Sequence, residues 1–303
     1  MSARPEATPE ATRKRTTILT LQRKREEGEL ISMLTAYDYP TARAVDAAGV
    51  DAILVGDSLA MVVLGQPDTL AVTVEEMLHH AKAVSRAAPH ALLIGDLPFM
   101  SYQADVAEAV RNAGRFLKEA GMDAVKLEGG RDYAGTISAI VKAGIPVQGH
   151  IGLRPQSMNM LGGYRVQGRT APAARELLED ALALDAAGCF SIVLEGIPDR
   201  LATYITNRLT IPTIGIGAGG GTSGQVLVVH DILGLCAGRS PRFVKTYTDL
   251  YAAMSVAIER YRDEVGSRAF PGSEHSYGIS DEEWAGFLAT VEPKSPPRPR
   301  RVK

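Results

Sequence analysis

The chain has 303 residues, a formal net charge of −2 and a hydrophobic fraction of 45%. This length suits one large α/β barrel with extra terminal segments, and the near-zero charge gives no support to a nucleic-acid or anionic-membrane partner. Cys189 and Cys236 are too few for a disulfide framework or a thiolate metal site, which fits a reducing cytoplasm. No apolar run reaches the roughly 18 residues of a membrane span, and the first 16 residues lack the apolar core of a secretory signal.

In chain order, we predict a leader with a short helix over residues 1–28 (the helix at 17–28), a barrel over 29–247, C-terminal helices within 248–291 and a disordered basic tail over 292–303. The two C-terminal helices are expected at 248–265 and 280–291. Short apolar runs, typical of a parallel sheet buried on both faces, predict strands near 31–36, 52–56, 91–95, 123–127, 146–150, 190–194 and 212–216. An eighth strand is expected within 226–235.

Amphipathic helices are predicted between the strands, one of them opening on a capping box of Thr73 and Glu76. Residues 49–55 and 121–127 form an internal repeat, which indicates repeated βα units. Four helix-to-strand junctions carry a glycine suited to a left-handed helix end, at Gly49, Gly121, Gly144 and Gly188. Strict alternation over about eight units predicts a (β/α)₈ TIM barrel, with an open doubly wound sheet as the alternative.

Five predicted strands end in an ionisable residue: Asp57, Asp96, Glu128, His150 and Glu195. Barrel enzymes place catalytic groups at the C-terminal ends of strands, so these side chains are expected around one mouth. Lys126 lies two residues before Glu128 and therefore shares its face of the strand. A lysine in an apolar strand is costly unless it is paired with a charge, so it is either a structural ion-pair partner or an anion-binding group beside a metal.

Three carboxylates without cysteine suit a hard cation, and Mg²⁺ fits them better than Zn²⁺. A 2-oxo acid would fit two of the positions that Mg²⁺ leaves open. The metal would then act as a Lewis acid on the oxo group and stabilise an enolate, and Glu195 is the carboxylate left over as a base. The glycine run at 215–220 matches a dinucleotide-binding motif but comes too late in the chain for one. Surface roles are expected for three histidines (His79, His80 and His90), and the role of His230 is open.

The sequence resembles the ketopantoate hydroxymethyltransferase family from about Leu34 to Ser276. The motifs that carry the resemblance are LTAYDY at 34–39, VGDS at 55–58, DLPF at 96–99, VKLEGG at 125–130, GHIGLRPQS at 149–157, GGYRVQGR at 162–169, IPTIGIGAG at 211–219 and EHS at 274–276. The resemblance implies a (β/α)₈ barrel, Mg²⁺ and a homodecamer. It also implies hydroxymethyl transfer from 5,10-methylenetetrahydrofolate to 3-methyl-2-oxobutanoate, which gives 2-dehydropantoate (ketopantoate) for pantothenate biosynthesis.

The family's functional residues have counterparts here. The resemblance assigns the metal to Asp57, Asp96 and Glu128, the keto-acid contacts to Asp57, Ser58, Asp96 and Lys126, and proton removal from C3 to Glu195. His150 matches a histidine of the substrate pocket whose role the resemblance leaves open. The chain departs from the family pattern at Gly196 and at 220–221, and the second departure leaves the folate contacts of that loop unassigned.

Two other functions compete with this one. A C–C lyase similar to phosphoenolpyruvate mutase and isocitrate lyase would share the barrel and metal but carries a catalytic cysteine on a loop, whereas Cys189 is expected at the barrel end opposite Glu195. A non-catalytic, metal-dependent binding protein would be expected to have lost part of the charged set, and every position is filled.

Overall fold

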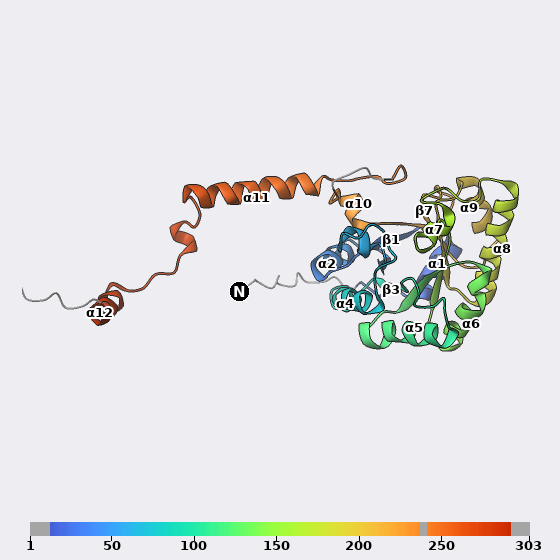
Figure 1. Cartoon of the computed structure of the whole chain (residues 1–303), viewed down its shortest axis with the longest axis horizontal. Coiled ribbons are helices and arrows are strands. Elements are labelled where there is room, and N and C mark those ends of the chain that lie inside the picture. The colour runs from blue at the N-terminus through green and yellow to red at the C-terminus, as the bar shows by residue number, and fades with distance from the viewer. Residues whose placement is uncertain (1–12, 237–240, 292–303) are drawn as a thin grey trace, which may run out of the picture. The chain divides into compact units, whose positions relative to one another are not determined.

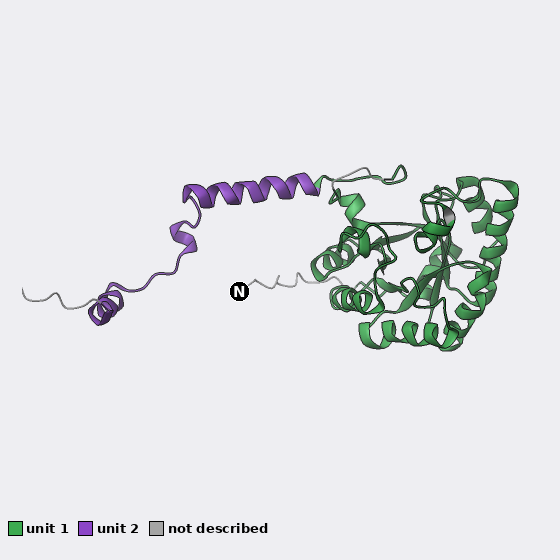
Figure 2. Ribbon diagram, in the orientation of Figure 1, with its two compact units in different colours: residues 1–249 green, residues 250–303 purple. Residues whose placement is uncertain are grey.

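The computed structural model describes residues 13–236 and 241–291. The chain divides into two compact units, residues 1–249 and 250–303 (Figure 2). Most of the predicted leader and the predicted tail at 292–303 lie outside the described residues. Among the helices of the described part, none is both long and apolar enough to cross a membrane.

The first unit is a closed barrel of eight parallel strands in the order β1 to β8 (Figure 1), which confirms the predicted fold class and excludes the open sheet. The strands are β1 (Ile31–Thr35), β2 (Ala52–Val55), β3 (Leu92–Asp96), β4 (Ala124–Glu128), β5 (Val147–Gly152), β6 (Ser191–Glu195), β7 (Thr213–Ile216) and β8 (Gly224–Leu227). The eighth strand begins before the predicted range of 226–235, and it ends at Leu227 because 229–233 forms a helix.

Helices follow most strands and surround the barrel (Figure 1). They are α1 (Ile18–Glu27), α2 (Tyr39–Ala47), α3 (Leu59–Val62), α4 (Val74–Ser85), α5 (Val106–Ala120), α6 (Ala134–Lys142), α7 (Met158–Leu161), α8 (Ala171–Ala187), α9 (Asp199–Thr206) and α10 (Val229–Leu233), with 3₁₀ turns at Arg131–Tyr133 and Pro155–Ser157. The second unit contains α11 (Leu250–Ser267), a 3₁₀ turn at Ser273–His275 and α12 (Asp281–Val291). The glycine-rich run at 215–220 begins in β7 and continues into the β7–β8 connection, which contains no helix.

Local signals in the sequence correspond to local structure. Thr73 and Glu76 make both halves of the predicted capping box at α4. The four junction glycines all have positive φ, between 70° and 97°. In the internal repeat, Asp51 and Asp123 play equivalent parts, because each carboxylate accepts a hydrogen bond from the backbone of a neighbouring strand, from Ser32 N at 2.8 Å and Leu93 N at 2.9 Å.

The strands bury two separate apolar layers. One fills the space between the sheet and the helices. The other lies inside the barrel and includes Ala52, Leu54, Ile94, Ala124 and Val193. Because side chains alternate along a strand, residues two or four positions further along these strands also point into the barrel. That inward register carries the polar side chains at the C-terminal mouth.

Gly95 in β3 allows the ring of Phe116 on α5 to pack against the strand, because a Cβ at this position would overlap that ring. We expect Gly95→Ala to lower the free energy of unfolding by about 1–3 kcal/mol, as overpacking does. Gly114→Ala on the same helix is the matched control, because the added Cβ would meet nothing closer than 3.9 Å. This substitution should stabilise the helix by about 0.5–1 kcal/mol. Urea denaturation measures both, and equal effects would contradict the packing argument.

Candidate active site

The register of three adjacent strands brings charged residues together at the C-terminal end of the barrel. Lys126 and Glu128 share the inward face of β4. Asp96 of β3 stands beside Lys126 in register, and His150 of β5 stands beside Glu128. All four side chains are buried. The predicted grouping of these strand ends is therefore present in the structure.

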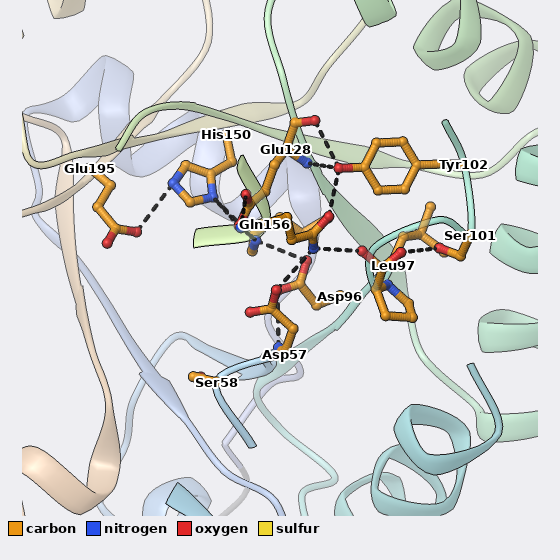
Figure 3. Close-up of polar contacts among 12 residues, drawn as sticks. Asp57, Ser58, Asp96, Leu97, Ser101, Tyr102, Glu128, His150, Gln156 and Glu195 are labelled. Carbon is orange, nitrogen blue, oxygen red and sulfur yellow. Dashed lines mark hydrogen bonds and ion pairs between the residues drawn. The ribbon is translucent and has the colours of Figure 1, made fainter. Parts of the chain in front are cut away.

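These side chains form a chain of ion pairs. Lys126 Nζ lies 2.8 Å from Asp96 Oδ1 and 3.9 Å from Glu128 Oε1. His150 Nδ1 lies 3.4 Å from Glu128 Oε1, and Nε2 on the other side of the ring lies 3.2 Å from Glu195 Oε2 at the end of β6 (Figure 3). The imidazole thus connects the buried acidic cluster to the more exposed carboxylate of Glu195.

Gly152 of β5 is the residue that lets Glu195 take this position. Gly152 pairs with Glu195 in the β5–β6 register and has φ +98°, and a Cβ here would collide with the Glu195 carbonyl oxygen. Only a residue without a Cβ combines this conformation with such a close approach. The backbone of Glu195 is therefore fixed beside β5, where its side chain meets His150.

Asp57 joins the cluster through the loops and not through strand register. Its backbone N–H donates to Asp96 Oδ2 at 3.2 Å, and its own Oδ2 accepts from the Gln156 side chain at 2.9 Å (Figure 3). Gln156 also accepts a hydrogen bond from the hydroxyl of Tyr102 at 2.9 Å. Gln156 and Tyr102 are buried in the site but were missed from the sequence, although Gln156 lies inside the motif at 149–157.

Ser58 follows Asp57 and lies at the edge of the cluster. Its hydroxyl is 2.8 Å from the hydroxyl of Tyr37, a buried residue of the motif at 34–39. The His230 ring, whose role the sequence left open, lies 5.4 Å from the Tyr37 ring, centroid to centroid. These contacts fix the Ser58 side chain beside the mouth.

Two of the histidines expected to have surface roles make specific contacts, so that expectation was wrong for them. His80 Nδ1 lies 2.6 Å from the carbonyl oxygen of Tyr37. His90 Nδ1 lies 2.9 Å from the buried carboxylate of Asp46. The sequence did not reveal these partners because they lie more than 40 residues away along the chain.

Burial and crowding shift the ionisation of the acids. Burial raises the pKa of Asp57 well above its ordinary value, and the neighbouring charges of Asp96 and Glu128 raise it further. Burial also raises the pKa of Asp96, with Lys126 opposing the shift. For Glu128 burial acts in the same direction, but His150 and Lys126 outweigh it and hold the pKa of that carboxyl below its usual value.

The two basic groups are stabilised in their charged forms. Burial lowers the pKa of Lys126, but the surrounding carboxylates outweigh it and raise the pKa above its ordinary value. Burial and Lys126 lower the pKa of His150, but Glu128 and Glu195 outweigh both and bring it to about 9. The charged imidazole therefore forms an ion pair with Glu195, whose Oε2 lies 3.2 Å from Nε2, and His150 is not placed as a base toward it.

The predicted metal ligands fit a hard cation in their chemistry. Glu128 Oε1 is buried and makes no hydrogen bond with any described residue, although the cations of His150 and Lys126 lie 3.4 Å and 3.9 Å from it. When all three are ionised, Asp57, Asp96 and Glu128 carry more negative charge than Lys126 and a charged His150 balance, and oxygen donors suit Mg²⁺. However, no three His, Cys, Asp or Glu side chains in the described part of the chain already converge in the geometry of a bound metal.

A closed (β/α)₈ barrel with an acidic, lysine-containing centre at the C-terminal mouth defines a barrel enzyme. The family model described as ketopantoate hydroxymethyltransferase matches residues 15–273, and the chain belongs to this family. It is 57% identical to the 3-methyl-2-oxobutanoate hydroxymethyltransferase of Pelobacter propionicus over 88% of this chain and 98% of that protein. It is 56% identical to the enzyme of the same name from Moorella thermoacetica over 88% of this chain and 99% of that protein.

Solved structures of more distant proteins share the fold. Phosphonopyruvate hydrolase has a TM-score of 0.58 and 13% identity over 91% of this chain and 98% of its own. A 2,3-dimethylmalate lyase, described as a member of the PEP mutase/isocitrate lyase superfamily, has a TM-score of 0.58 and 21% identity. The match covers 91% of this chain and 99% of that protein. At this identity the likeness concerns the fold alone.

Proposed function

We propose that the chain transfers a hydroxymethyl group from 5,10-methylenetetrahydrofolate to 3-methyl-2-oxobutanoate and so forms 2-dehydropantoate. Membership of the hydroxymethyltransferase family supports the reaction. The observation that carries the proposal within the structure is the position of Glu195, next to the buried acidic cluster but separated from it by His150. A base and an anion-binding centre thus lie side by side at one mouth.

The residues divide the work between binding and proton transfer. Lys126 and Ser58 are suited to the substrate's carboxylate and oxo group, since one supplies a buried cation and the other a hydroxyl. Mg²⁺, held by Asp57, Asp96 and Glu128, would supply Lewis-acid polarisation of the oxo group when bound. Glu195 accepts the C3 proton, and C3 then forms a bond to the folate methylene carbon. The two bonds from that carbon to the folate nitrogens break, one replaced by the bond to C3 and the other by a bond to a water oxygen. C3 is left with a hydroxymethyl group, and the nitrogens of tetrahydrofolate take up the C3 proton and one proton from water.

His150 sets the direction of the Glu195 carboxylate. With Nε2 3.2 Å from Glu195 Oε2 and Nδ1 beside Glu128, the charged ring attracts one oxygen of Glu195 and leaves the other for the proton. This arrangement explains why a histidine buried within the pocket accompanies a carboxylate base.

Turnover tests the proposal directly. Purified protein with 3-methyl-2-oxobutanoate, 5,10-methylenetetrahydrofolate and Mg²⁺ should form 2-dehydropantoate, detected by mass spectrometry. Chelation of divalent ions should stop product formation, and added Mg²⁺ should restore it. Full turnover by chelator-treated protein shown to be metal-free by elemental analysis would contradict the metal requirement.

The rival lyase activity has less support. Cys189 is buried just before β6, whereas Glu195 ends that strand at the opposite mouth. Cys236 is exposed after α10. Neither cysteine stands with the acidic cluster, so a lyase that depends on a catalytic cysteine would lack that group here.

The remaining parts of the proposal concern assembly and location. We propose a homodecamer in the cytoplasm, in line with the family resemblance and with the absence of a membrane-spanning helix among the described residues. Sedimentation-velocity measurement of the purified protein would establish the oligomeric state.

A further inference from the structure

Gln156 uses its side-chain amide and its backbone to hold two of the acidic residues. Its Nε2 donates to Asp57 Oδ2 at 2.9 Å and to the Leu97 carbonyl oxygen at 3.0 Å. Its backbone N–H donates to Glu128 Oε2 at 3.1 Å. One residue from the loop after β5 thus contacts carboxylates that arise from the β2 and β4 ends of the barrel (Figure 3).

Tyr102 fixes the orientation of the Gln156 amide. The Tyr102 hydroxyl lies 2.9 Å from Gln156 Oε1 and 2.9 Å from the Glu128 carbonyl oxygen, and it accepts from the Glu128 backbone N–H at 3.2 Å. A flipped amide would turn its oxygen toward the Leu97 carbonyl and the Asp57 carboxylate, which are both acceptors. The amide is therefore held with its N–H groups directed at Asp57 and at the Leu97 carbonyl oxygen.

The hydrogen bonds from Gln156 determine which oxygen of each carboxylate already has a hydrogen-bond partner. The Oδ2 atom of Asp57 and the Oε2 atom of Glu128 are each occupied by a hydrogen bond from Gln156. Glu128 Oε1 is buried and makes no hydrogen bond with any described residue. The hydrogen bonds from Gln156 thus orient both carboxylates. They turn Glu128 Oε1 toward His150 and Lys126, and on Asp57 they use Oδ2 alone.

We propose that Gln156, locked by Tyr102, is a positioning residue that presents Asp57 to a divalent cation in the acidic cluster. The inference rests on the proposed metal-dependent function and adds to it a residue outside the predicted ligand set. Groups that orient metal ligands through hydrogen bonds typically change metal affinity by about 10–100-fold when they are removed. A substitution at position 156 that removes the amide loses the side-chain hydrogen bond to Asp57. The backbone N–H bond to Glu128 remains in every variant except proline.

The test compares two buried glutamines of the same barrel. Gln156→Leu removes the amide while keeping a similar volume. Gln148→Leu is the matched control, because Gln148 is buried in β5 and donates to Ser191 Oγ at 2.8 Å without contacting a carboxylate. Affinity for Mn²⁺ alone is measured by electron paramagnetic resonance of the free ion, without substrate or folate, and thermal unfolding is followed in parallel.

We expect Gln156→Leu to weaken Mn²⁺ binding by about 10–100-fold and Gln148→Leu to leave it within a factor of two or so. Equal Mn²⁺ affinities for wild type and a folded Gln156→Leu would overturn the inference while leaving the proposed function intact. If wild type binds no Mn²⁺, the proposed function fails and the inference with it.

Tyr102→Phe keeps the test decisive if Gln156→Leu does not fold. It removes the hydroxyl that locks the amide and keeps the ring, so Mn²⁺ affinity should fall toward the lower end of the same range, about tenfold. An unchanged affinity in a folded Tyr102→Phe would overturn the part assigned to Tyr102 and, where Gln156→Leu is unfolded, the inference as a whole.

Discussion

Glu195→Gln should abolish exchange of the C3 proton of 3-methyl-2-oxobutanoate while the protein still binds substrate and metal. Glutamine keeps the shape of the side chain and its contact with His150 Nε2, which lies 3.2 Å from Glu195 Oε2, but it cannot accept a proton from carbon. Removal of a general base costs about 10²–10⁴-fold in rate. In D₂O with Mg²⁺, the loss of the C3 proton signal in NMR measures the exchange directly.

This exchange experiment separates proton removal from folate chemistry. Wild type should exchange the proton without carbon transfer, and an unreactive folate analogue is added in case folate must bind first. Glu176→Gln, an exposed glutamate on α8, is the matched control and should exchange at the wild-type rate. Exchange by Glu195→Gln at that same rate would assign the base to another group.

The positions that strand register controls were the ones the sequence predicted well. Asp96, Glu128, His150 and Glu195 each end an apolar run, and the barrel brings such ends to one mouth. Alternation along β4 also placed Lys126 on the face of Glu128. Periodicity of two and the repetition of βα units are local properties, so they can be read without knowing the tertiary structure.

The loop residues could not be placed in this way. Gln156 and Tyr102 come from the loops after β5 and β3 and meet only in the folded barrel, at 2.9 Å between hydroxyl and amide oxygen. Asp57 was predicted at this mouth as the residue after a strand, but its hydrogen bond with Gln156 was not. A buried glutamine gives no periodic signal and carries no charge, so its partners follow from three-dimensional packing alone.

The sequence also left two interpretations of Lys126 open, and the geometry sharpens the choice between them. Its ammonium group lies 2.8 Å from Asp96 Oδ1, and both side chains are almost fully buried. A structural ion pair would matter for folding alone. An anion-binding group would in addition set the affinity for the oxo acid, which gives the two interpretations different measurable consequences.

Lys126→Met should lower the free energy of unfolding at neutral pH by about 3–5 kcal/mol, since it leaves a buried carboxylate without its cation. A protein whose free energy of unfolding lies well within the ordinary range, at roughly 10 kcal/mol, remains folded after that loss. If Lys126 also binds the substrate carboxylate, the KM for 3-methyl-2-oxobutanoate should rise about ten- to a hundredfold, as expected for a charged hydrogen bond of roughly 1.5–3 kcal/mol. Urea denaturation and steady-state kinetics measure the two effects separately.

Lys24→Met is the matched control for this substitution. Lys24 Nζ also lies 2.8 Å from a carboxylate, that of Asp51, but the pair is more exposed and stands before β2, at the opposite end of the barrel from the acidic cluster. Its loss should destabilise the fold less, because solvent partly hydrates the remaining carboxylate, and should leave the KM unchanged. A folded Lys126→Met with an unchanged KM would make Lys126 a structural ion-pair partner only. A raised KM in Lys126→Met, absent from Lys24→Met, assigns its charge to the substrate, because general destabilisation of the barrel would not single out the variant at the acidic mouth.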